Sequence, residues 1–132
     1  MSSWILYCDG ASRGNPGQAG AGALLISPDG EEIPLTRYLG EKTNNQAEYE
    51  GVLLGLEELV RRGAKEIEVR ADSQLLIRQL DGQYRVKHEG LRPLYKKAME
   101  YLSHFSKVSL IHIPREENKK ADRLSNDAID FK

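Results

Sequence analysis

Four acidic residues occupy positions at which carboxylates from distant parts of the chain can meet. Asp9 and Asp72 each follow a short apolar run typical of a buried strand, whereas Glu48 and Asp122 are expected in the first turns of two helices. Neighbouring strands lie about 4.8 Å apart, so Asp9 and Asp72 would share one ion if their strands were parallel neighbours. Four carboxylates in one cleft repel each other, and some take up protons unless a cation neutralises them. The pattern therefore predicts a cation-binding cleft.

The residue types favour a hard divalent cation in that cleft. Carboxylate oxygens without a cysteine or histidine cluster suit Mg²⁺ or Mn²⁺ and not zinc. The histidines, His88, His104 and His112, are scattered and lack zinc-ligand spacing. Two divalent ions about 4 Å apart support in-line attack of water on a phosphodiester, because they stabilise both the entering and the leaving oxygen. The chemistry indicated is metal-assisted hydrolysis of a phosphodiester.

Each acid also has an ordinary structural explanation. Asp72 can cap the helix that follows it. Glu48 and Asp122 can balance the dipoles of their helices, and Asp9 before a glycine fits turn chemistry. For any single acid these explanations carry more weight than catalysis. The hypothesis of a site depends on all four acids together and on a topology that brings them to one place.

The elements that must position these acids alternate between strand and helix patterns. Strand-like runs cover residues 3–9, 19–26, 31–39, 66–71 and 107–113. Helical stripes cover residues 45–62 and 91–105. A short helix begins at Asp72 and Ser73 and ends near Leu80, and a last helix carries Ala121, Leu124 and Ala128. The glycine-rich stretch 10–18 is expected to form a turn.

This order predicts an α/β fold. We expect a five-stranded mixed sheet, with a three-strand antiparallel meander followed by parallel strands, flanked by helices. Pro34 should place the third strand at an edge of the sheet, since it has no donor for a ladder. Thr43 and Gln46 predict a capping box at the start of the long helix, and Gly63 predicts its end. The first strand is the natural junction of the sheet, and ligands of such sheets bind near the carboxyl ends of strands at a junction.

Composition and charge narrow the function further. At 39% hydrophobic and 30% charged residues, the chain fits a single globular domain over residues 1–132. No stretch approaches the roughly 18 apolar residues of a membrane span, and the N-terminus shows no signal-peptide pattern. The single cysteine, Cys8, favours a reducing compartment, so we expect a cytoplasmic protein. The net charge of −1 weighs mildly against nucleic acid, although basic groups stand at 85–97 and 115–123. For such groups a solvated helix face is the ordinary explanation.

Four motifs in order resemble those of ribonuclease H type 1 over nearly the whole chain. They are DGASRGNPG after the first strand, TNNQAE at 43–48, ADSQ at 71–74 and REENKKAD at 115–122. The resemblance implies an endonuclease that hydrolyses the RNA strand of RNA–DNA hybrids and leaves 5′-phosphate and 3′-hydroxyl ends. It also implies that the catalytic, metal-binding acids are Asp9, Glu48, Asp72 and Asp122. By that resemblance Asp9 bridges two Mg²⁺ ions when substrate is bound, and Mn²⁺ is a substitute.

The resemblance also implies which residues bind the substrate. Residues that resemble readers of the RNA minor groove are Ser12, Gly14, Asn15, Asn44, Asn45 and Gln74. An amide side chain suits the 2′-hydroxyl, because that group both donates and accepts hydrogen bonds. Thr43 and Asn45 resemble a pocket for a phosphate of the DNA strand, and Asn118 matches an asparagine near the active site. Helix capping is the ordinary alternative for Asn44, Asn45 and Asn118.

Two departures from the longer members of the family stand out. The loop before the last acid holds Arg115 where many members have a histidine, as in a shorter branch of the family. Arginine stays protonated and cannot act as a general base, so its role would be to stabilise phosphate charge or to steer product release. A surface ion pair with Glu116 or Glu117 is the ordinary alternative. The chain also lacks the basic insertion after the third motif. Activity on double-stranded RNA is therefore left open, and the expected state is a monomer away from membranes.

Other functional classes fit the sequence less well. A junction resolvase or four-acid exonuclease would share the acids but not TNNQAE behind DGASRGNPG. A non-catalytic binding module would have no use for carboxylates that repel phosphate. A sugar-kinase or actin-like ATPase would need a second lobe, which 132 residues do not provide.

Overall fold

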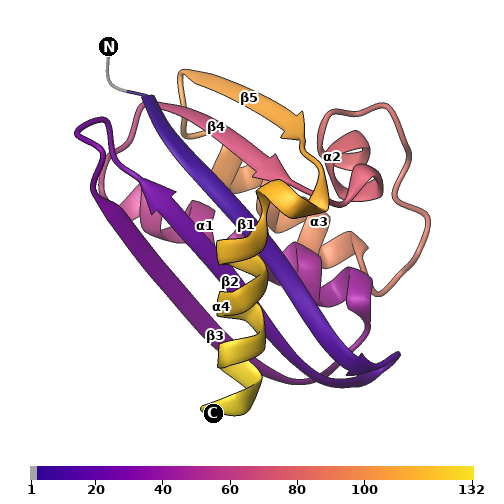
Figure 1. Ribbon diagram of the computed structural model, residues 1–132. Helices are drawn as coiled ribbons and strands as arrows, with labels where there is room; N and C mark the ends of the chain where they lie inside the picture. Colours follow the sequence, from indigo (N-terminus) through magenta and orange to yellow (C-terminus); the bar gives the residue numbers. More distant parts are fainter. Residues whose placement is uncertain (1–2) are drawn as a thin grey trace.

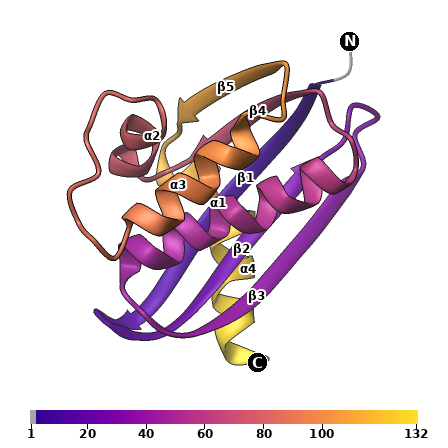
Figure 2. The same cartoon turned by 180° about the vertical axis from the view of Figure 1, so that it is seen from behind.

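The computed structural model describes residues 3–132, which form a five-stranded sheet with helices on both faces (Figure 1, Figure 2). The strands are β1 (Ser3–Gly14), β2 (Gly17–Ile26), β3 (Glu32–Lys42), β4 (Glu66–Ala71) and β5 (Lys107–His112). The helices are α1 (Asn44–Arg61), α2 (Gln74–Leu80), α3 (Arg92–Leu102), the 3₁₀ helix η1 (Arg115–Glu117) and α4 (Lys119–Asp130). Within residues 3–132, none of the helices is both long enough and apolar enough to cross a membrane.

The predicted order and type of the strands are confirmed. The sheet has the order β3-β2-β1-β4-β5. β1 pairs antiparallel with β2 and parallel with β4, so the first strand is the junction of the sheet, as expected. β3 lies at an edge, which fits the missing donor of Pro34.

The expected turn over residues 10–18 is wrong, because most of this stretch is strand. β1 continues to Gly14 and its ladder with β2 closes at Gly14 and Gly17. Gly14, with φ +121°, belongs to the short turn that remains, whereas Gly10 serves helix packing. A Cβ on Gly10 would lie 2.1 Å from the Ala47 carbonyl carbon of α1. A local sequence cannot show this need, because the helix that requires the space lies far along the chain.

Both ends of α1 follow the sequence signals. Thr43 Oγ1 accepts a hydrogen bond from the Gln46 backbone N–H at 3.2 Å, and Gln46 Oε1 accepts one from the Thr43 N–H at 2.9 Å. This is the predicted capping box. At the other end Gly63 adopts φ +73°, a left-handed conformation that glycine enters without strain.

The two faces of the sheet carry different helices. Figure 2 shows α1 lying along one face with α3 beside it, and Figure 1 shows α4 crossing the opposite face. The apolar side of α1 is fully buried on the sheet at Val52, Leu56 and Leu59. α4 packs directly on the β2 backbone, since a Cβ on Gly22 would lie 2.5 Å from the Ser125 nitrogen. The glycines therefore let both helices approach β1 and β2 closely.

Candidate active site

Three of the predicted acids meet at one end of the sheet. Asp9 lies on β1, Glu48 on α1, and Asp72 directly after β4. One carboxylate oxygen from each lies within 4.8 Å of the others, which is a distance at which one cation can contact all three. The parallel β1–β4 ladder ends at Tyr7 and Arg70, so Asp9 and Asp72 both lie just beyond its end.

The fourth acid reaches the same place from the opposite face. Alternate residues of a strand share a face, and Asp9 pairs with Gly22, on which α4 packs. Asp122, in the first turn of α4, lies close enough to Asp9 to help raise the pKa of the Asp9 carboxyl. A cleft of about 490 Å³ is lined by all four acids together with Gly10, Ala11, Ser12, Asn44, Ser73, Arg115 and Asn126.

Glu48 enters this cleft from the α1 side of the sheet. The backbone of α1 touches that of β1, since a Cβ on Gly51 would lie 2.3 Å from the Asp9 carbonyl oxygen. Glu48 is the fifth residue of α1, beyond its first turn, which contains no acid. Its expected place in the first turn is therefore wrong, and the helix dipole does not explain it. The capping explanation for Asp72 is also wrong, because Ser73 caps α2.

Burial and crowding change the acidity of this cluster. The pKa of Asp9 is raised from 3.8 to about 8, first by desolvation and then by the charge of Asp72. The pKa of Glu48 is raised from 4.5 to about 7 by desolvation and by Asp72, against a hydrogen bond with the Ser73 side chain that lowers it. Without a cation, the folded protein thus holds protons on these carboxylates near neutral pH.

The donor set fits a hard divalent cation. Each residue of the cluster offers carboxylate oxygen, and no histidine or cysteine joins it within residues 3–132. Such oxygen-only sets bind Mg²⁺, Mn²⁺ or Ca²⁺ in preference to zinc. A cation would replace the protons that Asp9 and Glu48 otherwise retain, so the site is suited to hold a divalent metal.

The turn between β1 and β2 borders the cleft and brings several predicted substrate residues together. Ser12 Oγ lies within hydrogen-bond distance of the carbonyl oxygens of Gly14 and Lys42, the latter at 2.7 Å, and its single proton can be donated to either. Asn15 Oδ1 accepts a hydrogen bond from the Asn44 backbone N–H at 3.0 Å. These bonds join the turn to the start of α1, so the two candidate RNA-contacting segments form one surface.

Thr43 and Asn45 line a second hollow of about 340 Å³ next to the first. Asn15, Asn44, His88 and Leu91 complete its lining. His88 is the residue that the sequence did not indicate there. Its Nδ1 accepts a hydrogen bond from the Gly90 N–H at 3.0 Å, which leaves Nε2 as the ring nitrogen that carries a proton in the neutral form.

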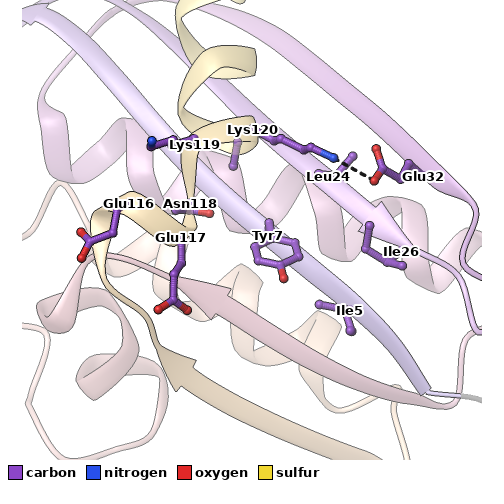
Figure 3. Close-up of a pocket in the computed structure, with 11 residues that line it drawn as sticks. Ile5, Tyr7, Leu24, Ile26, Glu32, Glu116, Glu117, Asn118, Lys119 and Lys120 are labelled. Carbon is purple, nitrogen blue, oxygen red and sulfur yellow. Dashed lines mark hydrogen bonds and ion pairs between the residues drawn. The ribbon is translucent and has the colours of Figure 1, made fainter.

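Three predicted substrate residues line neither hollow, and one of them is Gly14, at the end of β1. Gln74 is exposed at the start of α2. Asn118 is 1% exposed, and its Nδ2 donates to the Cys8 carbonyl oxygen at 3.0 Å. Its expected side-chain cap on α4 is absent, although it does stand at the N-cap position. Figure 3 shows Asn118 beside a different hollow of about 360 Å³, near the Lys120–Glu32 ion pair.

Three further residues, Arg115, Ser73 and Asn126, line the cleft beside the acids. Arg115 lines the cleft and forms no ion pair within residues 3–132, so the expected alternative of a pair with Glu116 or Glu117 is wrong. Ser73 and Asn126 were not singled out from the sequence. Asn126 follows Asp122 by four residues on a helix, and that spacing was the available signal.

Part of the basic group at 85–97 also surrounds a hollow. Arg85, Arg92 and Lys96 line a depression of about 700 Å³ with Tyr84, a residue that is 45% exposed. The Arg78 guanidinium lies 5.3 Å from the Tyr84 ring centroid. This surface presents positive charge and an aromatic ring together, which are features that bind nucleic acid.

Comparison with known proteins gives a consistent picture. A family model described as "Reverse transcriptase-like" matches residues 7–128. The bifunctional protein Rv2228c of Mycobacterium tuberculosis is 41% identical over 128 residues, which are 96% of this chain and 35% of that protein. The chain therefore spans about a third of the length of that relative. A ribonuclease H of Pseudomonas syringae is 33% identical over 139 residues, which cover 95% of this chain and 91% of that protein.

A solved structure agrees with the relatives. LC11-RNase H1, isolated from compost by a metagenomic approach, has been crystallised in complex with an RNA/DNA hybrid. That structure matches this one with a TM-score of 0.90 at 40% identity, covering 97% of each chain. Together with the family match over residues 7–128 and the relative of similar length, this similarity shows that the chain belongs to the type 1 ribonuclease H family.

Proposed function

We propose that this protein is an endonuclease that hydrolyses the RNA strand of RNA–DNA hybrids and leaves 5′-phosphate and 3′-hydroxyl ends. The observation that carries the proposal is the meeting of Asp9, Glu48 and Asp72 within 4.8 Å, with Asp122 in the same cleft. The similarity to LC11-RNase H1, which was crystallised with a hybrid, supports the choice of substrate.

The four acids would hold divalent cations, proposed to be two Mg²⁺ ions when substrate is bound, with Mn²⁺ as a substitute. Asp9 would take part in holding both ions, because its carboxylate neighbours both Asp72 and Asp122. When bound, the ions supply Lewis-acid stabilisation of the entering and leaving oxygens. The acids hold no proton in that state, because the cations provide the neutralising charge.

The β1–β2 turn and the start of α1 are proposed to read the RNA strand. Asn15 Oδ1 is occupied by the Asn44 N–H, so the Asn15 amide nitrogen remains free to donate to a 2′-hydroxyl. Ser12 donates its own proton to a backbone carbonyl and can accept one from a 2′-hydroxyl. Gly14, Asn44, Asn45 and the exposed Gln74 complete this proposed contact surface.

The second hollow is proposed to take a phosphate of the DNA strand. Thr43 Oγ1 accepts a hydrogen bond from the Gln46 N–H and so can still donate its hydroxyl proton to a phosphate oxygen. Asn45 and the Nε2 side of His88 offer two further donors in the same hollow. A hollow lined by hydrogen-bond donors and lacking a carboxylate is suited to an anion. In a hybrid, a phosphate of the DNA strand lies at a fixed distance from the RNA strand.

Arg115 and Asn118 take different roles in the proposal. Arg115 lies at the cleft without an ion pair to any of residues 3–132, and it would stabilise phosphate charge or steer the product out. Asn118 is proposed to act on the site through the backbone of Cys8, beside Asp9, because it is buried there. We also propose that the protein acts as a monomer in the cytoplasm, where Cys8 stays reduced.

A cleavage assay with end-labelled RNA tests the proposal. The RNA is presented in a hybrid, as a duplex with RNA and as a single strand, with Mg²⁺, with Mn²⁺ or with chelator. We expect metal-dependent cutting of the RNA in the hybrid, and loss of cutting in Asp9→Asn. Asp29→Asn, which changes an exposed acid between β2 and β3, is the matched control and should cut normally. Comparable cutting of double-stranded RNA would broaden the substrate class. Binding of the hybrid without cutting would refute the proposed nuclease activity.

A further inference from the structure

Asn126 is placed to control the carboxylate of Asp122. It stands one turn further along α4 and lines the same cleft. Its Nδ2 donates to the Asp122 carbonyl oxygen at 3.0 Å and lies 3.5 Å from Asp122 Oδ1. The second distance is at the outer limit of a hydrogen bond. An amide nitrogen carries two protons, so one proton can serve the carbonyl while the other faces the carboxylate.

The opposite end of the Asn126 amide is held by Arg13. Arg13 Nη2 donates to Asn126 Oδ1 at 3.2 Å, and Nη1 donates to Asp130 Oδ1 at 2.6 Å. A guanidinium only donates hydrogen bonds. It therefore fixes the amide with its oxygen toward Arg13 and its nitrogen toward Asp122. The chain of contacts runs Asp130, Arg13, Asn126, Asp122.

Arg13 links two parts of the site that otherwise lie on separate elements. It follows Ser12 near the end of β1, whereas Asn126 and Asp130 lie on α4. Asp122 needs such a link more than the other acids do, because it is not among the three carboxylates that lie within 4.8 Å of one another. A short hydrogen-bond network is the usual way in which proteins fix the direction of a metal-binding carboxylate.

We propose that Asn126 is a positioning residue for the Asp122 carboxylate, and that Arg13 and Asp130 hold Asn126 in that orientation. This inference rests on the proposed metal-dependent function. It has a structural alternative. The Asn126 amide would then only bond back to the helix, and the Arg13–Asp130 pair, with side chains 46% and 49% exposed, would be a surface ion pair of little consequence.

A calorimetric titration of the protein with Mg²⁺, without nucleic acid, separates these two roles. Two variants of Asn126 are used: Asn126→Ala, and Asn126→Leu, which keeps the side-chain size without the amide. Both should raise the Kd for Mg²⁺ by roughly 10- to 100-fold. Arg13→Gln should cause a smaller change in the same direction. Arg37→Gln is the control, since Arg37 pairs with Glu57 at 3.2 Å with similar exposure, 42% and 48%, and neither residue lines the cleft of the acids.

Steady-state kinetics on the hybrid provide the second measurement. We expect kcat to fall in both Asn126 variants while KM changes by less than about twofold, because a misdirected Asp122 affects the chemical step more than substrate binding. An unchanged Kd for Mg²⁺ in both variants, with or without a lower Tm, would overturn the inference. If the unaltered protein cleaves no hybrid, the proposed function fails, and the Mg²⁺ titration still decides the role of Asn126.

Discussion

Replacing Asp9 with asparagine should stabilise the metal-free protein while abolishing its activity. The pKa of Asp9 is raised from 3.8 to about 8 by burial and by Asp72. A raised pKa means that the folded state binds the proton more tightly than the unfolded state does. The stability that this proton provides is complete below pH 4 and is lost as the pH rises to about 8. Asparagine does not titrate, so the variant should escape this loss.

The size of the effect follows from the two pKa values. The pKa of Asp9 in the unfolded state lies about three pH units below pH 7, and each unit corresponds to about 1.4 kcal/mol. The loss of stability therefore has an upper limit of about 4 kcal/mol at that pH. Solvent in the cleft reduces it, and the asparagine amide must find new partners at a cost of about 1–3 kcal/mol. We expect a net gain of roughly 2 kcal/mol, which is a rise in Tm of roughly 5–10 °C for a domain of this size.

Thermal unfolding in chelator at pH 5 and at pH 8 measures this effect, with Asp29→Asn as the control. The advantage of Asp9→Asn should grow with pH. Added Mg²⁺ should reduce the difference in Tm between Asp9→Asn and the unaltered protein, because the cation stabilises only a protein that binds it. An Asp9→Asn variant that is less stable than the unaltered protein at pH 8 in chelator would refute the reasoning. So would an advantage that is the same at both pH values.

Three further substitutions test how the site is built. Gly22→Ala places a Cβ 2.5 Å from the Ser125 nitrogen, so α4 must shift. We expect this shift to cost roughly 1–3 kcal/mol of stability. Because Asp122 moves with α4, kcat should also fall by roughly 100-fold. Normal activity in a Gly22→Ala protein that unfolds at a lower Tm would contradict this. Cys8→Ala should keep nearly full cleavage activity, because Cys8 is 1% exposed and packs in the core, and inactivity with an unchanged Tm would show a chemical role. Arg115→Gln should lower kcat/KM by roughly tenfold, about 1.4 kcal/mol of transition-state stabilisation, and equal rates for the two proteins would remove Arg115 from the proposed mechanism.

Much of the fold was predictable because its signals are local. The capping box at Thr43, the glycine at Gly63 and the edge placement of Pro34 each depend on the chemistry of a few neighbouring residues. The convergence of Asp9 and Asp72 was predictable as well, since the parallel pairing of their strands follows from the order of elements. The four motifs supplied the acids that come from the helices.

The errors have a common cause in contacts between distant parts of the chain. The stretch after Asp9 has the composition of a turn, but most of it is strand, and its Gly10 allows α1 to approach β1. Asn118 stands where a helix cap is expected, yet the carbonyl oxygen of Cys8 takes its amide. Asn126 and His88 gave no strong signal, because each becomes part of a hollow only after other elements pack beside it.

The metal requirement of this site follows from how firmly its acids are held. Asp9 belongs to a strand paired on both sides along part of its length, Glu48 to a helix whose backbone touches that strand, and Asp122 to a helix packed on Gly22. Moving the backbone of Asp9, Glu48 or Asp122 away from the others would therefore disturb packed elements of the fold. The repulsion among them can be relieved only by protons or by cations. A cation binds the ionised carboxylates, whereas a proton removes their charge, so divalent metal and protons compete for the same residues. Activity should therefore rise with pH wherever the Mg²⁺ concentration is below saturation.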